Sequence, residues 1–455
     1  MRSGILCRSV SAATALVTAS TAAATAQKPP AVRQIGKLER ISIDSLASAA
    51  AAVWISNGSV FVNDITGRRV MLFDSTLARS VTVADTSSVT ANAYTPRPGT
   101  LIRYRGDTAL LIAPSSLSML VLGPTGNIVR VMAIPRSNEA QAFGGGNWGT
   151  PGFDARGRLI YFNTLGVLPG VTMLRPREPL GPDGEPISLR QAVIAGFVTS
   201  SNQRVDSAVI IRADLITRAV DTAAWIRVPR ARRALKADAQ HLLTTIETTP
   251  DPLPLVDDWV VMPDGSLAIV RGRDYHVDWL DGNGRWSSSP KMPFDWQRVD
   301  DARKQTLIDS AVKDWQATFD KVAEARRSAG GGGSAAGRGA GGTGGRGGGG
   351  GGGSGGASDI APNVAVSPSL NDVPDYFPPF KLGASRADAD GNIWILTTAI
   401  VNRRPVYDIV NRHGELVDRV QLPEFRTIAG FGPGVVYMAV KDSTGIVRLE
   451  RARVK

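Results

Sequence analysis

The side chains that most often carry acid–base chemistry or bind metal are scarce in this sequence. Histidine occurs only at His241, His276 and His413, on different parts of the chain, so a three-histidine metal site is not expected. His276 lies in an alternating, strand-like run and His413 lies in a turn. Structural or solvent-exposed roles are typical of such positions, and we therefore assign no catalytic residue and no metal ligand.

A signal for ligand binding comes from arginine and aromatic residues beside glycine-rich loops. The loop 143–148, Phe-Gly-Gly-Gly-Asn-Trp, lets the backbone approach a ligand closely, and Trp148 offers a face for stacking. Arg271, Arg273 and Asp274 follow an alternating run and could face the same place. These four residues are the candidate ligand contacts. The alternative is that Trp148 packs between structural units and that the arginines are solvated.

The charge balance is basic, with 52 Lys and Arg against 41 Asp and Glu and a formal net charge of +11. Such an excess favours anionic partners, among them lipid headgroups, acidic polysaccharide and nucleic acid. The basic residues are scattered apart from a cluster within 227–236, so a solvated surface is the simpler interpretation.

The first 26 residues have the pattern of a cleaved export signal. Arg2 and Arg8 form a positive region, residues 10–25 are small and apolar, and Ala-Thr-Ala at 24–26 fits a cleavage site before Gln27. Removal of this segment also removes the only cysteine, so the mature chain would carry no disulfide. We expect a periplasmic or extracellular protein without a transmembrane span, and an uncleaved anchor is the alternative. Nucleic acid is not an expected partner of an exported chain.

A repeated pattern of strands organises the rest of the sequence. Residues 382–423 show four short strand-like runs separated by turns that contain Gly, Asp or Asn, which is typical of a four-stranded antiparallel sheet. Six copies of this unit predict an all-β, six-bladed β-propeller, which protects its sheet edges by closing into a ring. The last copy has three strands, and the extended run 38–43 can supply the fourth. The six copies span 58–84, 100–135, 153–229 with an interruption, 256–293, 382–423 and 428–454.

One copy has a motif of its own. Residues 58–64, Gly-Ser-Val-Phe-Val-Asn-Asp, are followed by Arg69 and by Phe-Asp at 73–74. This order resembles the NHL-type repeat, in which a glycine, an aromatic-bearing strand, an aspartate, an arginine and a closing Phe-Asp recur. The chain outside 165–203 and 295–379 resembles the secreted bacterial six-bladed propellers related to NHL proteins. The resemblance implies architecture, because propellers host binding modules, lyases and lactonases alike.

The propeller architecture leaves two classes of function open. The expected function is an exported binding or interaction module of the cell envelope, with an anionic or sugar-like ligand at the mouth of the channel and an envelope protein or anionic glycan as partner. The alternative is a metal-dependent lyase or lactonase-like hydrolase that uses Asp, Glu and Asn around the channel, for which calcium would be the cofactor. Asp264, Asp388 and Asp390 lie in turns, where a structural role is expected. No other cofactor is expected.

The longest interruption of the repeat, 295–379, contains two unlike parts. Apolar residues recur at helical spacing through 297–327, which predicts an amphipathic helix that packs against the propeller. Docking of this helix on a partner or a membrane surface is the alternative. Residues 329–358 are dominated by glycine and predict a disordered, flexible linker. We expect one domain over 27–455, interrupted by this insertion, and a monomer.

Overall fold

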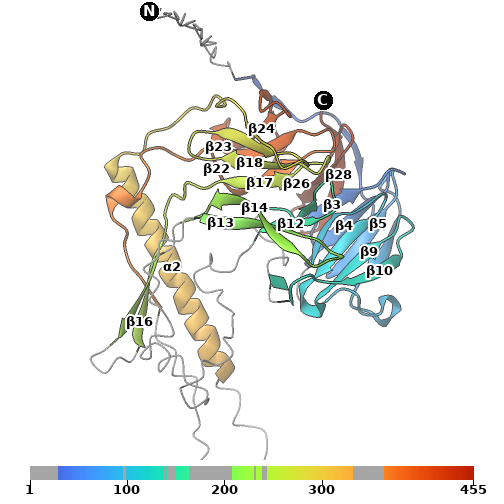
Figure 1. Ribbon diagram of the computed structural model, residues 1–455, viewed down its shortest axis with the longest axis horizontal. Coiled ribbons are helices and arrows are strands. Elements are labelled where there is room, and N and C mark those ends of the chain that lie inside the picture. The colour runs from blue at the N-terminus through green and yellow to red at the C-terminus, as the bar shows by residue number, and fades with distance from the viewer. Residues whose placement is uncertain are drawn as a thin grey trace, which may run out of the picture.

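The computed structural model describes residues 29–95, 99–137, 139–140, 149–162, 207–229, 232–237, 243–330 and 363–455. These residues form six antiparallel four-stranded blades around a ring, which confirms the predicted six-bladed β-propeller (Figure 1). The first strand of each blade is the innermost, and neighbouring inner strands contact one another, as β17 does with β22 and β26 with β3.

Each blade is numbered by its place along the chain, and its strands run from the inside to the outside of the ring. The blades are, in order: β3 (Ala51–Trp54), β4 (Val60–Asp64), β5 (Arg69–Phe73) and β6 (Ser80–Ala84); β7 (Thr100–Arg103), β8 (Ala109–Ala113), β9 (Ser118–Leu122) and β10 (Ile128–Ala133); β11 (Gly152–Phe153), β12 (Leu159–Phe162), β13 (Ser207–Ala213) and β14 (Val220–Arg227); β17 (Asp258–Val261), β18 (Leu267–Arg271), β19 (His276–Leu280) and β20 (Trp286–Ser288); β22 (Phe380–Ala387), β23 (Ile393–Val401), β24 (Arg404–Val410) and β25 (Leu416–Gln421); β26 (Arg426–Gly432), β27 (Val435–Lys441), β28 (Val447–Arg453) and β2 (Leu38–Ile41). Short 3₁₀ turns lie at η1 (Ser88–Thr90), η2 (Pro114–Ser116) and η4 (Leu370–Asp372).

The two ends of the described chain meet in blade 6. Strand β2 pairs antiparallel with β28, with Leu38 opposite Ala452 and Ile41 opposite Glu450. This pairing confirms that the N-terminal run supplies the strand missing from the last copy. A second, unpredicted strand precedes it, because β1 (Val32–Gln34) pairs in parallel with β25 and covers the outer edge of blade 5. Covering an edge strand protects its unpaired backbone groups from other chains.

The turns between strands are fixed by aspartate side chains. In blade 5, Asp388 accepts the backbone N–H groups of Asp390 and Asn392 at 2.9 and 2.8 Å, and the indole N–H of Trp394 at 3.0 Å. Gly391 of the same turn has a φ of +87°, which glycine adopts without strain. Asp388 therefore has the structural role expected of an aspartate in this turn.

The aspartate and arginine of the NHL-like motif also pair. Asp64 contacts Arg69 at 3.0 Å and accepts the backbone N–H groups of Ala47 and Ser48 at 3.0 and 2.7 Å. Residues 47 and 48 belong to the connection that enters blade 1, so the pair ties this connection to the second strand of the blade.

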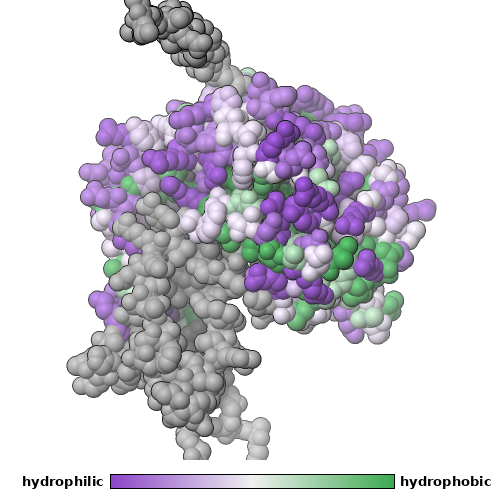
Figure 2. Space-filling view, viewed as in Figure 1, coloured by the Kyte–Doolittle hydropathy of each residue, from purple (hydrophilic) through white to green (hydrophobic). Residues whose placement is uncertain are grey.

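The hydrophobic core is divided among the junctions between blades. One cluster of buried apolar side chains joins blades 3 and 4 through Ile226, Trp259 and Ile269, and another joins blades 4 and 5 through Val270, Phe380 and Ile395. Alternate residues of a strand point to opposite faces of the sheet, so each blade contributes to two such clusters. The outer surface is mostly hydrophilic in the view of Figure 2, apart from an apolar area over β9 and β10.

A small second module stands beside the propeller. Strands β15 (Arg232–Ala237) and β16 (Leu243–Thr249) form a hairpin inserted between blades 3 and 4, while α2 (Asp301–Gly330) and β21 (Asn363–Ala365) are inserted between blades 4 and 5. Strand β21 pairs in parallel with β16, which joins the two insertions in one sheet. Helix α2 packs on β21 and η4 and stands off the blades at the left of Figure 1.

Helix α2 confirms the predicted helical insertion. Its first turns bury Ile308 and Lys304, and Lys304 pairs with Asp375 at 2.6 Å. Most of the predicted glycine linker and the whole predicted leader lie outside the described residues. Among the described residues, no helix has the length and the apolar character that crossing a membrane requires.

Candidate ligand-binding groove

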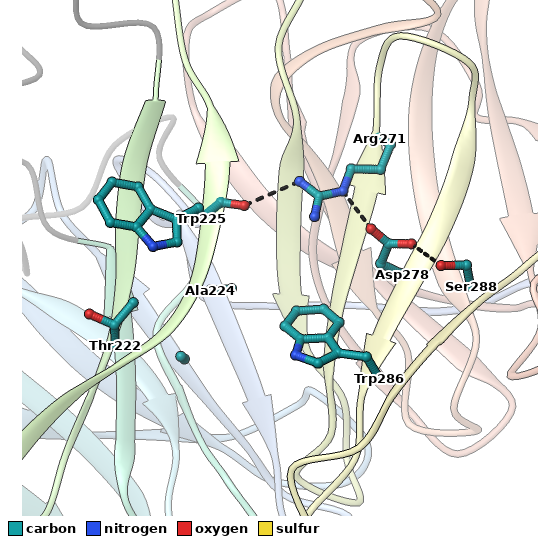
Figure 3. A pocket seen from close by; sticks show the side chains of 8 residues that line it. Thr222, Ala224, Trp225, Arg271, Asp278, Trp286 and Ser288 are labelled. Carbon is teal, nitrogen blue, oxygen red and sulfur yellow. Dashed lines mark hydrogen bonds and ion pairs between the residues drawn. The ribbon is translucent and has the colours of Figure 1, made fainter.

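A groove of about 610 Å³ lies between the outer parts of blades 3 and 4 (Figure 3). One wall comes from β14, the outermost strand of blade 3, and the other from β18, β19 and β20 of blade 4. Because the lining belongs mostly to outer strands, the groove lies toward the rim of the ring and not on its axis. Its lining residues are Thr222, Ala223, Ala224, Trp225, Arg271, Asp278, Trp286 and Ser288.

The pairing of strands in blade 4 directs Trp286 into the groove. Trp286 lies opposite Leu280, and paired residues point to the same face of a sheet. Leu280 is buried in the apolar cluster shared with blade 3, so the Trp286 ring faces blade 3 as well. The side chain stays half-exposed at 49%. It therefore offers an aromatic face inside the groove, as Figure 3 shows.

The second exposed tryptophan points the other way. Trp225 lies opposite Val209, which packs against the cluster shared by blades 2 and 3. Its ring is accordingly on the far side of β14 from Arg271 in Figure 3. Trp225 contributes its carbonyl oxygen to the groove, where it accepts a hydrogen bond from Arg271 Nη1 at 3.1 Å.

Arg271 is the cation of the groove, and its charge is already balanced. Its Nε donates to Asp278 Oδ2 at 2.7 Å, and its Nη1 donates to Asp257 Oδ2 at 2.8 Å. Burial alone would lower the pKa of the guanidinium, but the hydrogen bonds and charges of Asp278 and Asp257 raise it above its usual value. Arg271 thus stays charged and is held by two carboxylates.

Asp278 links the arginine to the outer strand. Its Oδ1 accepts the hydroxyl of Ser288 at 2.5 Å, and its Oδ2 accepts Nε of Arg271. Burial acts to raise the pKa of Asp278, but the hydrogen bonds from Ser288 and Arg271 together with the charge of Arg271 lower it below its usual value. The groove therefore presents an ionised carboxylate beside an indole ring.

A histidine completes this polar network. His276 Nδ1 lies 2.8 Å from Asp274 Oδ1, and His276 Nε2 lies 3.2 Å from Asp278 Oδ1. Lys291 lies 3.5 Å from the other oxygen of Asp274. The histidine is thus a partly buried strand residue between two carboxylates, in accord with the structural role expected for it.

Asp257 anchors the network to the connection between the two blades. Its side chain accepts the backbone N–H groups of Arg227 at 3.0 Å and Gly272 at 3.2 Å in addition to Arg271. The Asp257 backbone N–H donates to the carbonyl of Arg227 at 2.9 Å. The chain leaves the propeller at Arg227 to form the hairpin of β15 and β16 and returns at Asp257, so this contact closes the base of that insertion.

The sequence-predicted site residues have different places in the structure. Arg271 lines the groove, Asp274 lies one step behind it through His276, and Arg273 is exposed in the turn between β18 and β19. Trp148 lies outside the described residues. The assignment of these residues to ligand binding remains a prediction.

Sequence reasoning missed Trp286, Asp278 and Ser288. Trp286 and Ser288 alternate along β20, and Asp278 lies opposite Ser288 in β19. The alternation alone places all three on one face of blade 4. What it does not reveal is that β14 leaves this part of the face uncovered.

The opposite face of blade 4 holds a second, buried polar cluster. Tyr275 donates its hydroxyl to Asp408 Oδ2 of blade 5 at 2.8 Å, and Arg419 Nε donates to Asp408 Oδ1 at 3.1 Å. Burial, with the charge of Asp408 added to it, raises the pKa of the Tyr275 hydroxyl. Asp258 accepts the backbone N–H of Ser385 at 2.7 Å, while its other oxygen and the Ser385 hydroxyl are buried with no hydrogen-bond partner among the described residues.

No group of three or more His, Cys, Asp or Glu side chains within the described ranges is arranged to hold a metal ion. The sequence matches no protein-family model and no curated protein.

Solved structures with a related course of the chain are only distantly similar to this protein. They include virginiamycin B lyase from Staphylococcus aureus, with a TM-score of 0.37, 7% identity and coverage of 91% of this chain and 98% of that one. A candidate exported protein from Bacteroides fragilis has a TM-score of 0.41, 7% identity and coverage of 92% and 96%. Regucalcin from Agrobacterium tumefaciens has a TM-score of 0.35, 10% identity and coverage of 93% and 97%. At these values the likeness carries no argument about activity or ligand.

Proposed function

We propose that this chain is an exported binding module that holds a saccharide-like ligand in the groove between blades 3 and 4. The leader-like pattern of residues 1–26 supports export. The groove supports binding, because it places one exposed aromatic ring beside a few fixed polar groups.

The single observation that carries the proposal is the half-exposed ring of Trp286 beside Asp278 and Ser288. A sugar ring has an apolar face of C–H groups and a rim of hydroxyl groups. The indole can take the first by stacking, and the carboxylate and hydroxyl oxygens can take the second by hydrogen bonds. Arg271 and Asp257 hold the carboxylate in place before any ligand arrives, which lowers the entropy cost of binding.

The proposal is tested by screening the mature chain against a panel of envelope and plant-type oligosaccharides, followed by calorimetric titration of the best binder. Trp286→Ala should weaken binding by about tenfold or more, because the stacking face is lost. Trp225→Ala is the matched control, since it removes an indole that is also exposed, 60% against 49%, and whose ring lies on the far side of β14. Its affinity should equal that of the unchanged protein.

Two results would overturn this assignment. One is a panel in which nothing binds at millimolar concentration. The other is a ligand whose affinity falls with Trp225→Ala and not with Trp286→Ala, since that would place binding on the opposite side of blade 3.

A further inference from the structure

The net charge of the whole chain and the charge of the groove point to different ligands. The chain is basic at +11, which would favour anions. Within the groove, however, Arg271 is bound to both Asp278 and Asp257, so its charge is neutralised by the protein itself. An anion entering the groove would have to compete with two carboxylates that are already in place.

The groups behind the groove strengthen this conclusion. Asp274 lies next to His276, and Lys291 is its cationic neighbour. Among the lining residues, Asp278 and Arg271 carry charge, and Asp257 is the second carboxylate that holds Arg271. The guanidinium of Arg271 is therefore compensated by two carboxylates, and an anionic group of a ligand would approach Asp278 without a free charge of Arg271 to offset the repulsion.

Blade 5 contains an aspartate that corresponds to Asp278 but is buried, and its contacts show which group binds an aspartate at this position. Asp408 has the position in β24 that Asp278 has in β19, because each lies opposite the third residue of its neighbouring strand, Ile395 and Ile269 respectively. Each also accepts an arginine Nε, from Arg419 and Arg271.

The hydroxyl partner differs between the two positions. Asp408 receives the hydroxyl of Tyr275 from the preceding blade. Asp278 receives only the serine hydroxyl of its own blade, and the side toward blade 3 is the groove. A ligand hydroxyl at this place would reproduce the contact that Tyr275 makes with Asp408.

We infer that the groove selects an uncharged, hydroxyl-rich ligand, one of whose hydroxyls donates to Asp278, and that it rejects the acidic form of the same ligand. This inference rests on the proposed function and names the chemical class of its ligand. It assigns Trp286 to affinity and Asp278 to the discrimination between neutral and acidic sugars.

The test uses two probes with one skeleton, tetragalacturonic acid and its fully methyl-esterified form. Both carry the same rings and the same secondary hydroxyls, and only the acid is charged at pH 7.5. Calorimetric titration of the mature chain should show binding of the ester with an affinity about tenfold or more above that of the acid. The affinity for the ester should change little between 50 and 500 mM salt, because no ion pair with the ligand forms.

The variant Asp278→Asn separates charge from shape. The asparagine keeps the size of the side chain and an acceptor oxygen, but it removes the negative charge and leaves Arg271 with less compensation. The preference for the ester should narrow to about twofold or reverse, because the repulsion of the acid is lost. Asp418→Asn, which removes the charge of an arginine-paired aspartate outside the groove, should leave the preference unchanged.

The outcomes distinguish this inference from the proposed function. Tighter, salt-sensitive binding of the acid that is lost in Trp286→Ala would overturn the inference and leave the proposed function intact. An equal preference in Asp278→Asn and the unchanged protein would also overturn it. Binding of neither probe, nor of any neutral glycan, would overturn both.

Discussion

Blade 4 packs against blade 3 on one face and against blade 5 on the other, and each of these two junctions contains an aspartate paired with an arginine. On the side of blade 3, Asp278 pairs with Arg271 and a serine hydroxyl, and its side chain is 16% exposed at the groove. On the side of blade 5, Asp408 pairs with Arg419 and a tyrosine hydroxyl, and its side chain is 2% exposed. Each aspartate thus pairs with an arginine and accepts one hydroxyl, but the two differ in exposure, and Asp278 has His276 as a further neighbour at 3.2 Å.

Aromatic side chains cover Asp408 at the junction of blades 4 and 5. The Tyr275 ring packs against Phe294 and Phe380, with ring centroids 5.6 and 6.1 Å apart. It seals Asp408 from water, so the carboxylate there serves to align two blades. A buried arginine–aspartate pair in this propeller is therefore a structural element, and a similar pair becomes a candidate site where the neighbouring blade leaves it exposed.

The consecutive residues Asp257 and Asp258 point toward different junctions of blade 4. Asp257 points toward blade 3 and holds Arg271, whereas Asp258 points toward blade 5 and accepts the backbone N–H of Ser385. The alternation of side chains along a strand separates them. Asp257 has a cation to pair with, and Asp258 has none among its hydrogen-bond partners.

The largest expected effect is on Asp408. Asp408→Ala should lower the free energy of unfolding by about 3–5 kcal/mol, because it leaves Arg419 and the Tyr275 hydroxyl without their buried partner. Asp278→Ala should lower it by about 1 kcal/mol, because the groups it releases can reach water. Urea titrations of both variants measure the two losses in the free energy of unfolding. Equal losses would show that burial of the aspartate does not distinguish the two junctions.

The next effect depends on pH and concerns Asp258. Burial raises the pKa of this carboxyl to about 6, although the hydrogen bond from the backbone N–H of Ser385 acts to lower it. The folded state therefore binds the proton more tightly than the unfolded chain, whose aspartate pKa is about 3.9. The contribution of Asp258 to stability is most favourable below about pH 4 and is lost as the pH rises through about 6.

Asp258→Asn removes this loss, since the amide carries no charge to bury. The variant should be more stable than the unchanged protein by about 2–3 kcal/mol at pH 7.5 and by nearly nothing at pH 4. Thermal melts at the two pH values test this. Asp257→Asn serves as the neighbouring control and should lower stability at pH 7.5, because its partner is Arg271. A gain from Asp258→Asn that is the same at both pH values would contradict the assignment.

The fold could be predicted from the sequence because its signals are local. Alternating apolar residues and turns such as 388–392 recur once per blade, and counting strands in the last copy was enough to place 38–43 beside β28. The pairing of β16 with β21 could not be predicted in this way, because it joins two insertions from different junctions. Neither the sequence of β16 nor that of β21 indicates that the two strands pair.

The site was predicted only in part for a similar reason. Arg271 stands at the end of an alternating run, where an arginine is conspicuous. The importance of Asp278 and Trp286 depends on how far β14 covers blade 4, which is a property of two blades together. An internal alignment of the copies offers one signal, since Asp278 and Asp408 fall at the same position and differ in the hydroxyl that reaches them.

The smallest expected effect compares those two hydroxyls directly. Tyr275→Phe keeps the aromatic ring and removes the hydroxyl, so the buried Asp408 loses one of its two side-chain hydrogen bonds. The free energy of unfolding should fall by about 1–3 kcal/mol. Ser288→Ala removes the corresponding donor from Asp278, which keeps Arg271 and can accept water in its place, so the loss should stay below about 0.5 kcal/mol. Urea titrations at one pH measure both losses, and a loss from Ser288→Ala as large as that from Tyr275→Phe would mean that the groove hydroxyl is part of the fold and is not free to exchange with a ligand.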